Sequence, residues 1–319
     1  MFEFMKNKKS NLKYLIYVLS FTYGLGQGFL KTSNTNIVNS NGEKVILQGI
    51  ALGGWLVPEG YMFQIPGSGS PTTIREKIVN LVGEDSANEF YQKFENNYVQ
   101  EADIKSISDW GFNSIRLPLH YKFFSPSIGQ YIDKGFTIVD SIVSWSKKYN
   151  LKVKQDMHAA PGAQNTSDFS DSEFNGDSEL FTSYTNQRWL ASTWKHIANY
   201  YKSEPVIAGY DLLNEPARPG VATTLRNIYE QCIDSIRTVD QNHMVIIEGN
   251  WYGNDHTGLF PPFDPNIVYS FHHYVGGIND TTTMYNQYRN GIALPVSYTH
   301  LRAHETREDR GCRGGGGKK

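Results

Sequence analysis

The chain has 319 residues, of which 39% are hydrophobic and 19% are charged, and its formal net charge is -2. This length suffices for one large core or for two or three domains, and the hydrophobic fraction excludes global disorder. The 30 basic and 32 acidic side chains nearly cancel, which excludes a strongly electropositive surface, so we expect no nucleic-acid partner. Cys232 and Cys312 are too few for a disulfide framework or a thiolate metal site.

Residues 1–28 have the layout of a secretory signal peptide. Lysines between Lys6 and Lys13 precede an apolar run from Tyr14 to about Leu25, and small residues follow at 24–28. The run is short for a bilayer and nothing like it recurs, so we expect no membrane span. A mildly hydrophobic first helix is the alternative. We predict a secreted protein, extracellular or periplasmic, whose mature chain begins near Phe29.

From residue 44 onward, β-branched runs alternate with amphipathic helical patterns. Strands are predicted at 44–50, 114–118, 151–156, 206–213, 244–247 and 267–271, and helices at 102–110, 136–148, 188–202 and 225–239. Strands separated by helices indicate a parallel sheet with right-handed crossovers.

An open doubly wound sheet and a closed barrel both fit this alternation. No glycine-rich phosphate loop follows any of the predicted strands. Polar side chains follow most of them instead, including Arg116, His158, Asn214, Glu215 and Glu248. A (β/α)8 barrel builds its active site from the carboxyl ends of many strands. We therefore predict an α/β fold of the (β/α)8 (TIM) barrel type.

Five sequence motifs occur in the order expected of one enzyme family. They are Leu-Gln-Gly-Ile-Ala-Leu-Gly-Gly-Trp-Leu-Val-Pro-Glu at 47–59, Ile-Arg-Leu-Pro at 115–118, Asp-Met-His-Ala-Ala-Pro-Gly-Ala-Gln-Asn at 156–165, Asp-Leu-Leu-Asn-Glu-Pro at 211–216 and Phe-His-His-Tyr at 271–274. Together they resemble glycoside hydrolase family 5, the cellulase-like family, and in particular its exo-β-glucanase branch. The resemblance implies a barrel over residues 29–296 that hydrolyses β-glucans with retention of configuration, using neither a cofactor nor a metal.

The resemblance also assigns the central chemical roles. Retaining cleavage of a glycosidic bond needs an acid at the leaving oxygen and a second carboxylate about 5 Å away. Glu215 corresponds to the acid/base, whose pKa must be raised so that it stays protonated. Asn214 corresponds to the residue that binds the sugar 2-hydroxyl, and Arg116 to a cation that orients the nucleophile and lowers its pKa.

Further residues are expected to bind sugar. They are Glu59, Trp55, His158, His272 and Tyr274. The histidines are interpreted as hydrogen-bond donors rather than metal ligands, because His272 and His273 would point to opposite faces of a strand. Tyr274 would share the face of His272. Glu59 would accept hydrogen bonds from hydroxyl groups, and Trp55 would either stack on a sugar ring or belong to the core.

The nucleophile is missing from the position that the resemblance assigns to it. In the family it follows strand seven, and the apolar run at 293–296 would begin that strand here. Residues 297–319 instead show no strand or helix pattern and contain a glycine run. They resemble translated adapter or vector sequence, with a natural flexible tail as the alternative. We expect a disordered, non-native tail and a barrel without strands seven and eight, which folds poorly and is inactive. Glu248, after strand five, is interpreted as a subsite loop residue.

Two other functions remain open at this point. A non-catalytic barrel could keep the sugar subsites and bind carbohydrate without cleaving it. A metal-dependent amidohydrolase would need a His-x-His after the first strand, where this sequence has Gly-Ile-Ala-Leu at 49–52. We expect a monomer whose partner is an oligomeric or polymeric β-glucan. The linkage, β-1,3 or β-1,4, and exo or endo action are left open.

Overall fold

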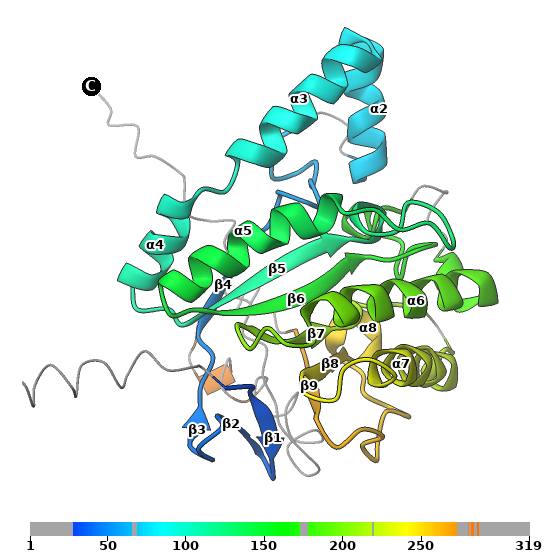
Figure 1. The fold of residues 1–319 in the computed structure, drawn as a ribbon. Coiled ribbons are helices and arrows are strands. Elements are labelled where there is room, and N and C mark those ends of the chain that lie inside the picture. Colours follow the sequence, from blue (N-terminus) through cyan, green and yellow to red (C-terminus); the bar gives the residue numbers. More distant parts are fainter. Residues whose placement is uncertain are drawn as a thin grey trace, which may run out of the picture.

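The computed structural model describes residues 28–65, 69–172, 178–218, 220–272, 280, 282–283 and 286 (Figure 1). A six-stranded parallel sheet organises this region, with its strands side by side in chain order. The strands are β4 (Gly49–Ala51), β5 (Ser114–His120), β6 (Lys152–Ala159), β7 (Ile207–Asp211), β8 (Met244–Glu248) and β9 (Ile267–Ser270). Sequential parallel order is the arrangement of consecutive strands in a (β/α)8 barrel.

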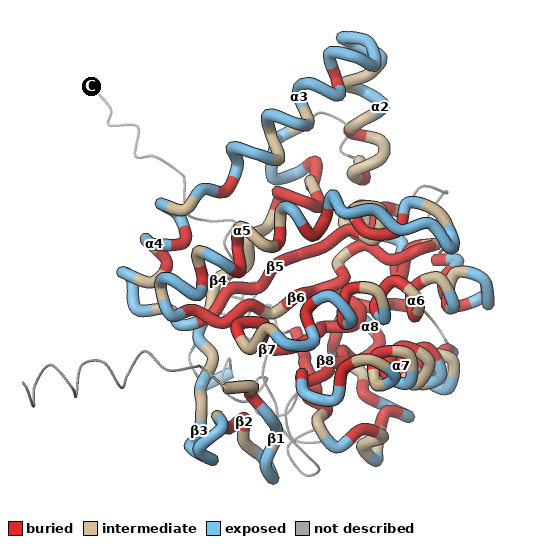
Figure 2. The backbone as a smooth tube through the Cα atoms, in the orientation of Figure 1, coloured by how far each residue is buried: buried red, intermediate tan, exposed pale blue. Residues whose placement is uncertain are grey.

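Side-chain alternation gives the sheet an apolar outer face and a polar inner face. On β5, Ile115, Leu117 and Leu119 are fully buried in the main hydrophobic core, whereas Arg116 points to the other face. Figure 2 shows strands β5 to β9 buried along nearly their whole length, with exposed residues on the surrounding helices. The inner face can therefore hold charged groups away from water.

Helices connect successive strands, as the sequence pattern predicts. They are α4 (Glu101–Asp109) before β5, α5 (Lys134–Lys148) before β6, α6 (Tyr184–Tyr201) before β7, α7 (Ala222–Arg237) before β8 and the short α8 (Asn250–Gly253) before β9. Basic residues occupy the last turn of α5, where they favour the negative end of the helix dipole. Within the described residues, no helix combines the length and apolar character needed to cross a membrane.

A helical hairpin between β4 and β5 is absent from the sequence prediction. It comprises α2 (Pro71–Val82) and α3 (Glu84–Asn97), and it projects from the body of the molecule in Figure 1. Ser70 caps α2, accepting a hydrogen bond from the Thr73 backbone N–H, and Pro71 occupies the first turn. This Ser-Pro start, with Gly83 at the end of α2, is a signal that could have revealed the hairpin.

The predicted first strand, 44–50, proves to be two strands in different sheets. Its first residues form β3 (Lys44–Val45), which pairs with β2 (Asn36–Val38) and then β1 (Lys31–Ser33) in a small antiparallel sheet. This sheet packs under the start of the parallel strands, where Leu30 and Ile37 form one apolar cluster with Met244 and Val268. The chain therefore closes the N-terminal end of the sheet before β4 enters it.

Four predictions fall on residues outside the described part of the chain. These are nearly all of the signal peptide (1–27), Tyr274, the start of strand seven at 293–296 and the tail at 297–319. Residues from Phe29 onward pack on the body, where the ring of Phe29 meets His243 edge-on at 4.9 Å.

Candidate active site

Two basic side chains and three carboxylates meet on the inner face of the sheet. Arg116 places Nη2 3.0 Å from Asp156 Oδ2 and 3.5 Å from Glu248 Oε1. Two residues before Asp156 on β6, Lys154 places Nζ 2.9 Å from Asp211 Oδ2. The three carboxylates are fully buried, and buried charges are tolerated only when they are paired. These ion pairs tie the four neighbouring strands β5 to β8 together across the inner face of the sheet.

The pair Asn214–Glu215 follows β7 directly above this network. Glu215 has φ 48°, a left-handed conformation that is uncommon for residues other than glycine. Its N–H donates to Glu248 Oε2 at 2.7 Å, and its carbonyl accepts from Asn165 Nδ2 at 2.9 Å. Asn214 Oδ1 accepts from Arg116 Nη2 at 2.6 Å. Hydrogen bonds to the backbone of Glu215 and to the side chain of Asn214 thus fix the orientation of these two residues.

The Glu215 carboxyl group lies against a histidine after β9. Glu215 Oε1 is 2.5 Å from Nδ1 of His272, and His272 Nε2 lies 3.0 Å from Glu248 Oε1. His272 therefore stands between the two glutamates. Both motifs named in the sequence, Asn-Glu-Pro and Phe-His-His, meet at this point.

Glu248 ends the fifth strand, as expected, but its interpretation as a subsite residue that contacts sugar is wrong. It is the last residue of β8 and has no exposed surface, and Tyr229 Oη bonds to both its N–H and its carbonyl. Burial raises the pKa of Glu248, but His272 and Arg116 outweigh this and hold the pKa below its usual range. Glu248 is thus a buried anion that accepts the hydrogen bond of the Glu215 backbone N–H and so supports the site.

The pKa of the neighbouring Asp211 is shifted in the opposite direction. Burial raises the pKa of Asp211 to about 7, with Lys154 opposing the rise and Glu248 and Asp156 adding to it. Oxygens of the three buried carboxylates lie within 4.8 Å of one another, a grouping that a hard cation could use. Arg116 and Lys154 already supply positive charge there. The carboxylates of the cluster thus already have basic partners, and the cluster supports the residues above it.

His158 and Glu59, both predicted to bind sugar, lie together on the other side of Arg116. His158 Nδ1 is 2.8 Å from Asp156 Oδ2, and its Nε2 is 4.0 Å from Glu59 Oε1. Burial lowers the pKa of His158, but the hydrogen bond and negative charge of Asp156 outweigh it, so the pKa is raised. The structure therefore gathers Glu59, His158, Arg116, Asn214, Glu215 and His272 into one site.

Trp55 lies deeper than a sugar-stacking residue would. Its side chain is 3% exposed within the main core, and its indole N–H donates to the Glu95 carbonyl at 2.9 Å. Of the two roles left open by the sequence, the structure favours the core role.

Two exposed aromatic residues beside the site carry no sequence signal. Trp251 and Tyr252, at the carboxyl end of β8, have φ 53° and 60°, and they are 46% and 36% exposed. The N–H of Tyr252 donates to the Pro216 carbonyl at 3.1 Å, which fixes the pair next to Glu215. Consecutive left-handed conformations in bulky residues are unfavourable and persist only where surrounding contacts impose them.

The sheet order and this cluster define a (β/α)8-type protein whose polar site lies at the carboxyl ends of its strands. Residues 74–301 match the family model Cellulase (glycosyl hydrolase family 5), and the chain belongs to that family. The family resemblance and the barrel fold class expected from the five motifs are thereby confirmed.

Individual proteins resemble the chain over most of its length. It is 32% identical over 250 residues to a β-xylosidase of Phanerodontia chrysosporium, covering 77% of this chain and 52% of that protein. It is 31% identical over 231 residues to endoglucanase C of Acetivibrio thermocellus, covering 71% and 60%. A crystal structure of a β-glucanase from Saccharophagus degradans superposes with a TM-score of 0.62 at 16% identity, covering 89% and 75%, which supports the fold. The chain thus spans about half to three fifths of the length of these curated relatives.

Proposed function

We propose that the chain derives from a secreted, retaining glycoside hydrolase that cleaves β-1,3- or β-1,4-linked glucans. The observation that carries this proposal is the fixed Asn214–Glu215 pair, held from below by Arg116 and Glu248. The relatives named as an endoglucanase and a β-xylosidase support glycoside hydrolysis. The basic, apolar and small-residue order of residues 1–28 supports secretion.

In the proposed reaction Glu215 donates its proton to the glycosidic oxygen as the leaving sugar departs. A second carboxylate attacks the anomeric carbon from the opposite face, and water activated by Glu215 then releases the product with its configuration retained. Asn214 Nδ2 has no hydrogen-bond acceptor among the described residues, so it is suited to bind the sugar 2-hydroxyl. His158 and Glu59 are suited to hold further hydroxyl groups of the same sugar.

The attacking carboxylate has no candidate among the described residues around Glu215. Glu248 cannot take this role, since its side chain is fully buried and its oxygens face the Glu215 N–H and His272. We assign the nucleophile to the seventh strand of the parent enzyme. In the present chain, we propose, residues 297–319 stand in place of that strand's sequence. The 319-residue chain would then bind glucan without hydrolysing it.

The sugar that leaves is assigned to the side of Trp251 and Tyr252. The acid must lie on the leaving-group side of the scissile bond. The backbone N–H of Tyr252 donates to the carbonyl of Pro216, the residue after the acid, so Tyr252 and its neighbour Trp251 lie close to Glu215 in the fold. Exposed aromatic faces stack on the apolar faces of sugar rings. We therefore assign the pair as a platform for the departing sugar.

The central test replaces Glu215 by Gln in the parent enzyme with its own seventh strand. Turnover of unactivated glucan should fall by at least about a hundredfold, because general acid catalysis contributes roughly that much. Aryl glycosides with acidic leaving groups should lose much less in the first step. NMR of the first product should show the β-anomer. Near-parental turnover of glucan by Glu215→Gln, or prompt appearance of the α-anomer, would overturn the proposal.

A further inference from the structure

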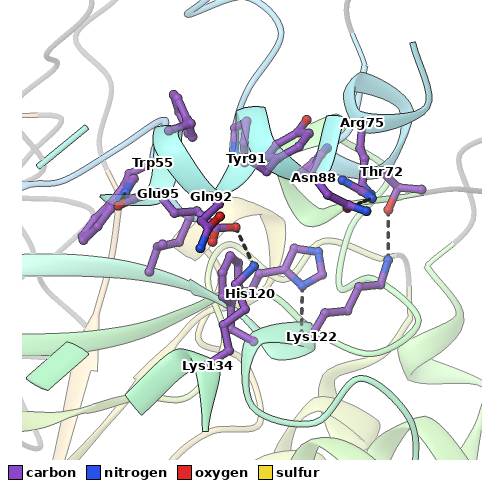
Figure 3. Close-up of a pocket in the computed structure, with 15 residues that line it drawn as sticks. Trp55, Thr72, Arg75, Asn88, Tyr91, Gln92, Glu95, His120, Lys122 and Lys134 are labelled. Atoms are coloured by element: carbon purple, nitrogen blue, oxygen red, sulfur yellow. Dashed lines mark hydrogen bonds and ion pairs between the residues drawn. The ribbon is translucent and has the colours of Figure 1, made fainter. Parts of the chain in front are cut away.

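A pocket of about 600 Å³ lies between the α2–α3 hairpin and the body of the molecule, outside the cluster around Glu215. Figure 3 shows Asn88, Gln92 and Glu95 of α3 on one side, with Lys122 and Lys134 on the other. This volume is within the range of small-molecule binding sites. The pocket is large enough for a ligand to contact both the hairpin and the body.

The side of α3 that lines the pocket carries polar and aromatic residues together. Asn88, Gln92 and Glu95 recur at helical spacing, and Tyr91 and Phe94 also line the pocket, whereas Phe90 is 46% exposed and does not line it. The pocket also has apolar walls from Leu56, Phe94 and Phe123. Apolar walls with a few convergent polar groups are typical of a ligand site.

The charges in this pocket cancel in pairs. Arg75 lies 2.5 Å from Glu84, Lys134 lies 2.7 Å from Glu95, and Lys122 lies 3.0 Å from Asp171. A site for phosphate or for an acidic sugar would offer positive charge that is not already matched by carboxylates. Amide groups, aromatic rings and balanced charges instead suit a neutral ligand rich in hydroxyl groups.

One buried carboxylate anchors the start of the hairpin. Asp171 accepts hydrogen bonds from the Thr72 N–H and hydroxyl, both at 2.8 Å, and pairs with His120 at 2.8 Å. Burial raises the pKa of Asp171, but His120 and Lys122 outweigh this and lower the pKa well below its usual range. This anchor fixes the start of α2 against β5, so the pocket is formed before any ligand arrives.

Two segments connect the pocket with the candidate active site. Leu56 and Pro58 line the pocket, and the next residue, Glu59, lies 4.0 Å from His158. On the other side, the ring of Phe169 lies 5.8 Å from that of His158, two residues before the Asp171 anchor. The pocket and the candidate active site therefore share the loop at 56–59 and the segment at 169–171.

We propose that the hairpin pocket is an outer subsite. It binds a neutral sugar unit of the β-glucan outside the cluster around Glu215, where the bond is cleaved. This inference rests on the proposed function of the Glu215 site, because it assumes that a glucan chain occupies that site. The hairpin then sets how long a glucan must be for full affinity.

The test measures binding of β-1,3- and β-1,4-gluco-oligosaccharides of increasing length to the full 319-residue chain by calorimetry. Affinity should rise with length, and N88A/Q92A should remove the rise for the longer ligands, weakening them about two- to tenfold per lost hydrogen bond. The control Lys93→Ala alters the exposed partner of Glu89 on the same helix and should leave the rise intact. High salt should change little, as expected for a neutral ligand.

The outcomes separate this inference from the proposed function. Binding that Asn214→Ala weakens but N88A/Q92A leaves unchanged at every length would overturn the outer subsite and leave the active-site proposal standing. Binding that Asn214→Ala does not affect would refute the proposed site itself. Binding confined to acidic oligosaccharides and lost in high salt would also overturn the outer subsite. Circular dichroism and thermal unfolding of each variant show that a lost affinity does not reflect a lost fold.

Discussion

The backbone N–H of Glu215 donates a 2.7 Å hydrogen bond to the side chain of Glu248, thirty-three residues further along the chain. The glutamate proposed to act on the substrate is thus held by a second glutamate that the substrate cannot reach. Glu248 holds the Glu215 turn from below while its other oxygen faces His272. One acid is available for proton transfer, and the other fixes its position.

Replacing Glu248 tests this division of roles. Glu248→Ala should lower the free energy of unfolding by about 1–3 kcal/mol, because the Glu215 N–H loses its buried acceptor. Glu248→Gln, which keeps an oxygen acceptor, should recover part of this loss. Urea titrations of both variants measure the effect. If Glu248→Gln in the parent enzyme abolished turnover while leaving stability and oligosaccharide binding unchanged, Glu248 would be the nucleophile and the assignment made here would be wrong.

The buried acid Asp211 should make stability depend on pH. Its pKa is raised from 3.8 to about 7, so the folded state holds a proton that the unfolded state releases. The resulting stabilisation is fully present below about pH 4 and is lost as the pH rises through 7. Asp211→Asn keeps an oxygen near Lys154 and removes the titration. The wild type should therefore lose more stability than this variant between pH 4 and pH 7. Parallel stability curves for the two proteins would contradict the prediction.

The anchor of the hairpin gives the opposite dependence on pH. The pKa of Asp171 is lowered in the folded protein, so its stabilisation is present near neutral pH and is lost as the pH falls below its unfolded value of about 3.8. Asp171→Ala should release the start of α2 and speed amide hydrogen exchange in residues 71–97, with smaller changes in β6 and β7. Exchange rates in the hairpin equal to those of the wild type would show that Asp171 does not anchor it.

Trp251 should contribute to binding of the leaving sugar. Trp251→Ala removes an exposed ring, so oligosaccharides that cross the scissile position should bind the printed chain several-fold more weakly, since ring contacts of this kind contribute about 0.5–1.5 kcal/mol. Ligand-induced changes in tryptophan fluorescence should shrink as well. Trp110, which is 68% exposed after α4, supplies the matched control Trp110→Ala. Equal losses in the two variants would count against the platform.

The printed chain itself should lack hydrolase activity. Glu305 and Glu308 are the only glutamates after Val296, and neither follows an apolar run that could place it about 5 Å from Glu215. Reducing-sugar assays with soluble glucans should show no release that depends on Glu215, although oligosaccharides still bind. Robust hydrolysis that disappears in Glu215→Gln would mean that a carboxylate of this chain acts as the nucleophile.

The sequence predicted the parallel strands because each is a short, buried, β-branched run between helical patterns. The sequence predicted Asn214 and Glu215 as site residues because their motif is a contiguous stretch of the chain. It did not predict the support by Glu248, Asp156 and Asp211, because these contacts depend on which face of each strand turns inward. The α2–α3 hairpin was missed although local signals for it exist. Ser70 and Pro71 begin α2, and Ala87 and Phe94 of α3 pack inward. The conformations of Trp251 and Tyr252 are imposed by contacts with Pro216 and Asn254 that no local pattern encodes.

The small sheet at the N-terminal end of the strands has a consequence for how the chain folds. The Thr32 N–H donates to Asn266 Oδ1 at 2.8 Å, a contact that spans 234 residues. Contacts of such long range slow folding, because a large loop must close before they form. During synthesis, the apolar side chains around Leu30 stay uncovered until β9 has been made. We expect this closure to be a late step in folding, and the exposed segment to be where an incompletely folded chain is most prone to aggregate.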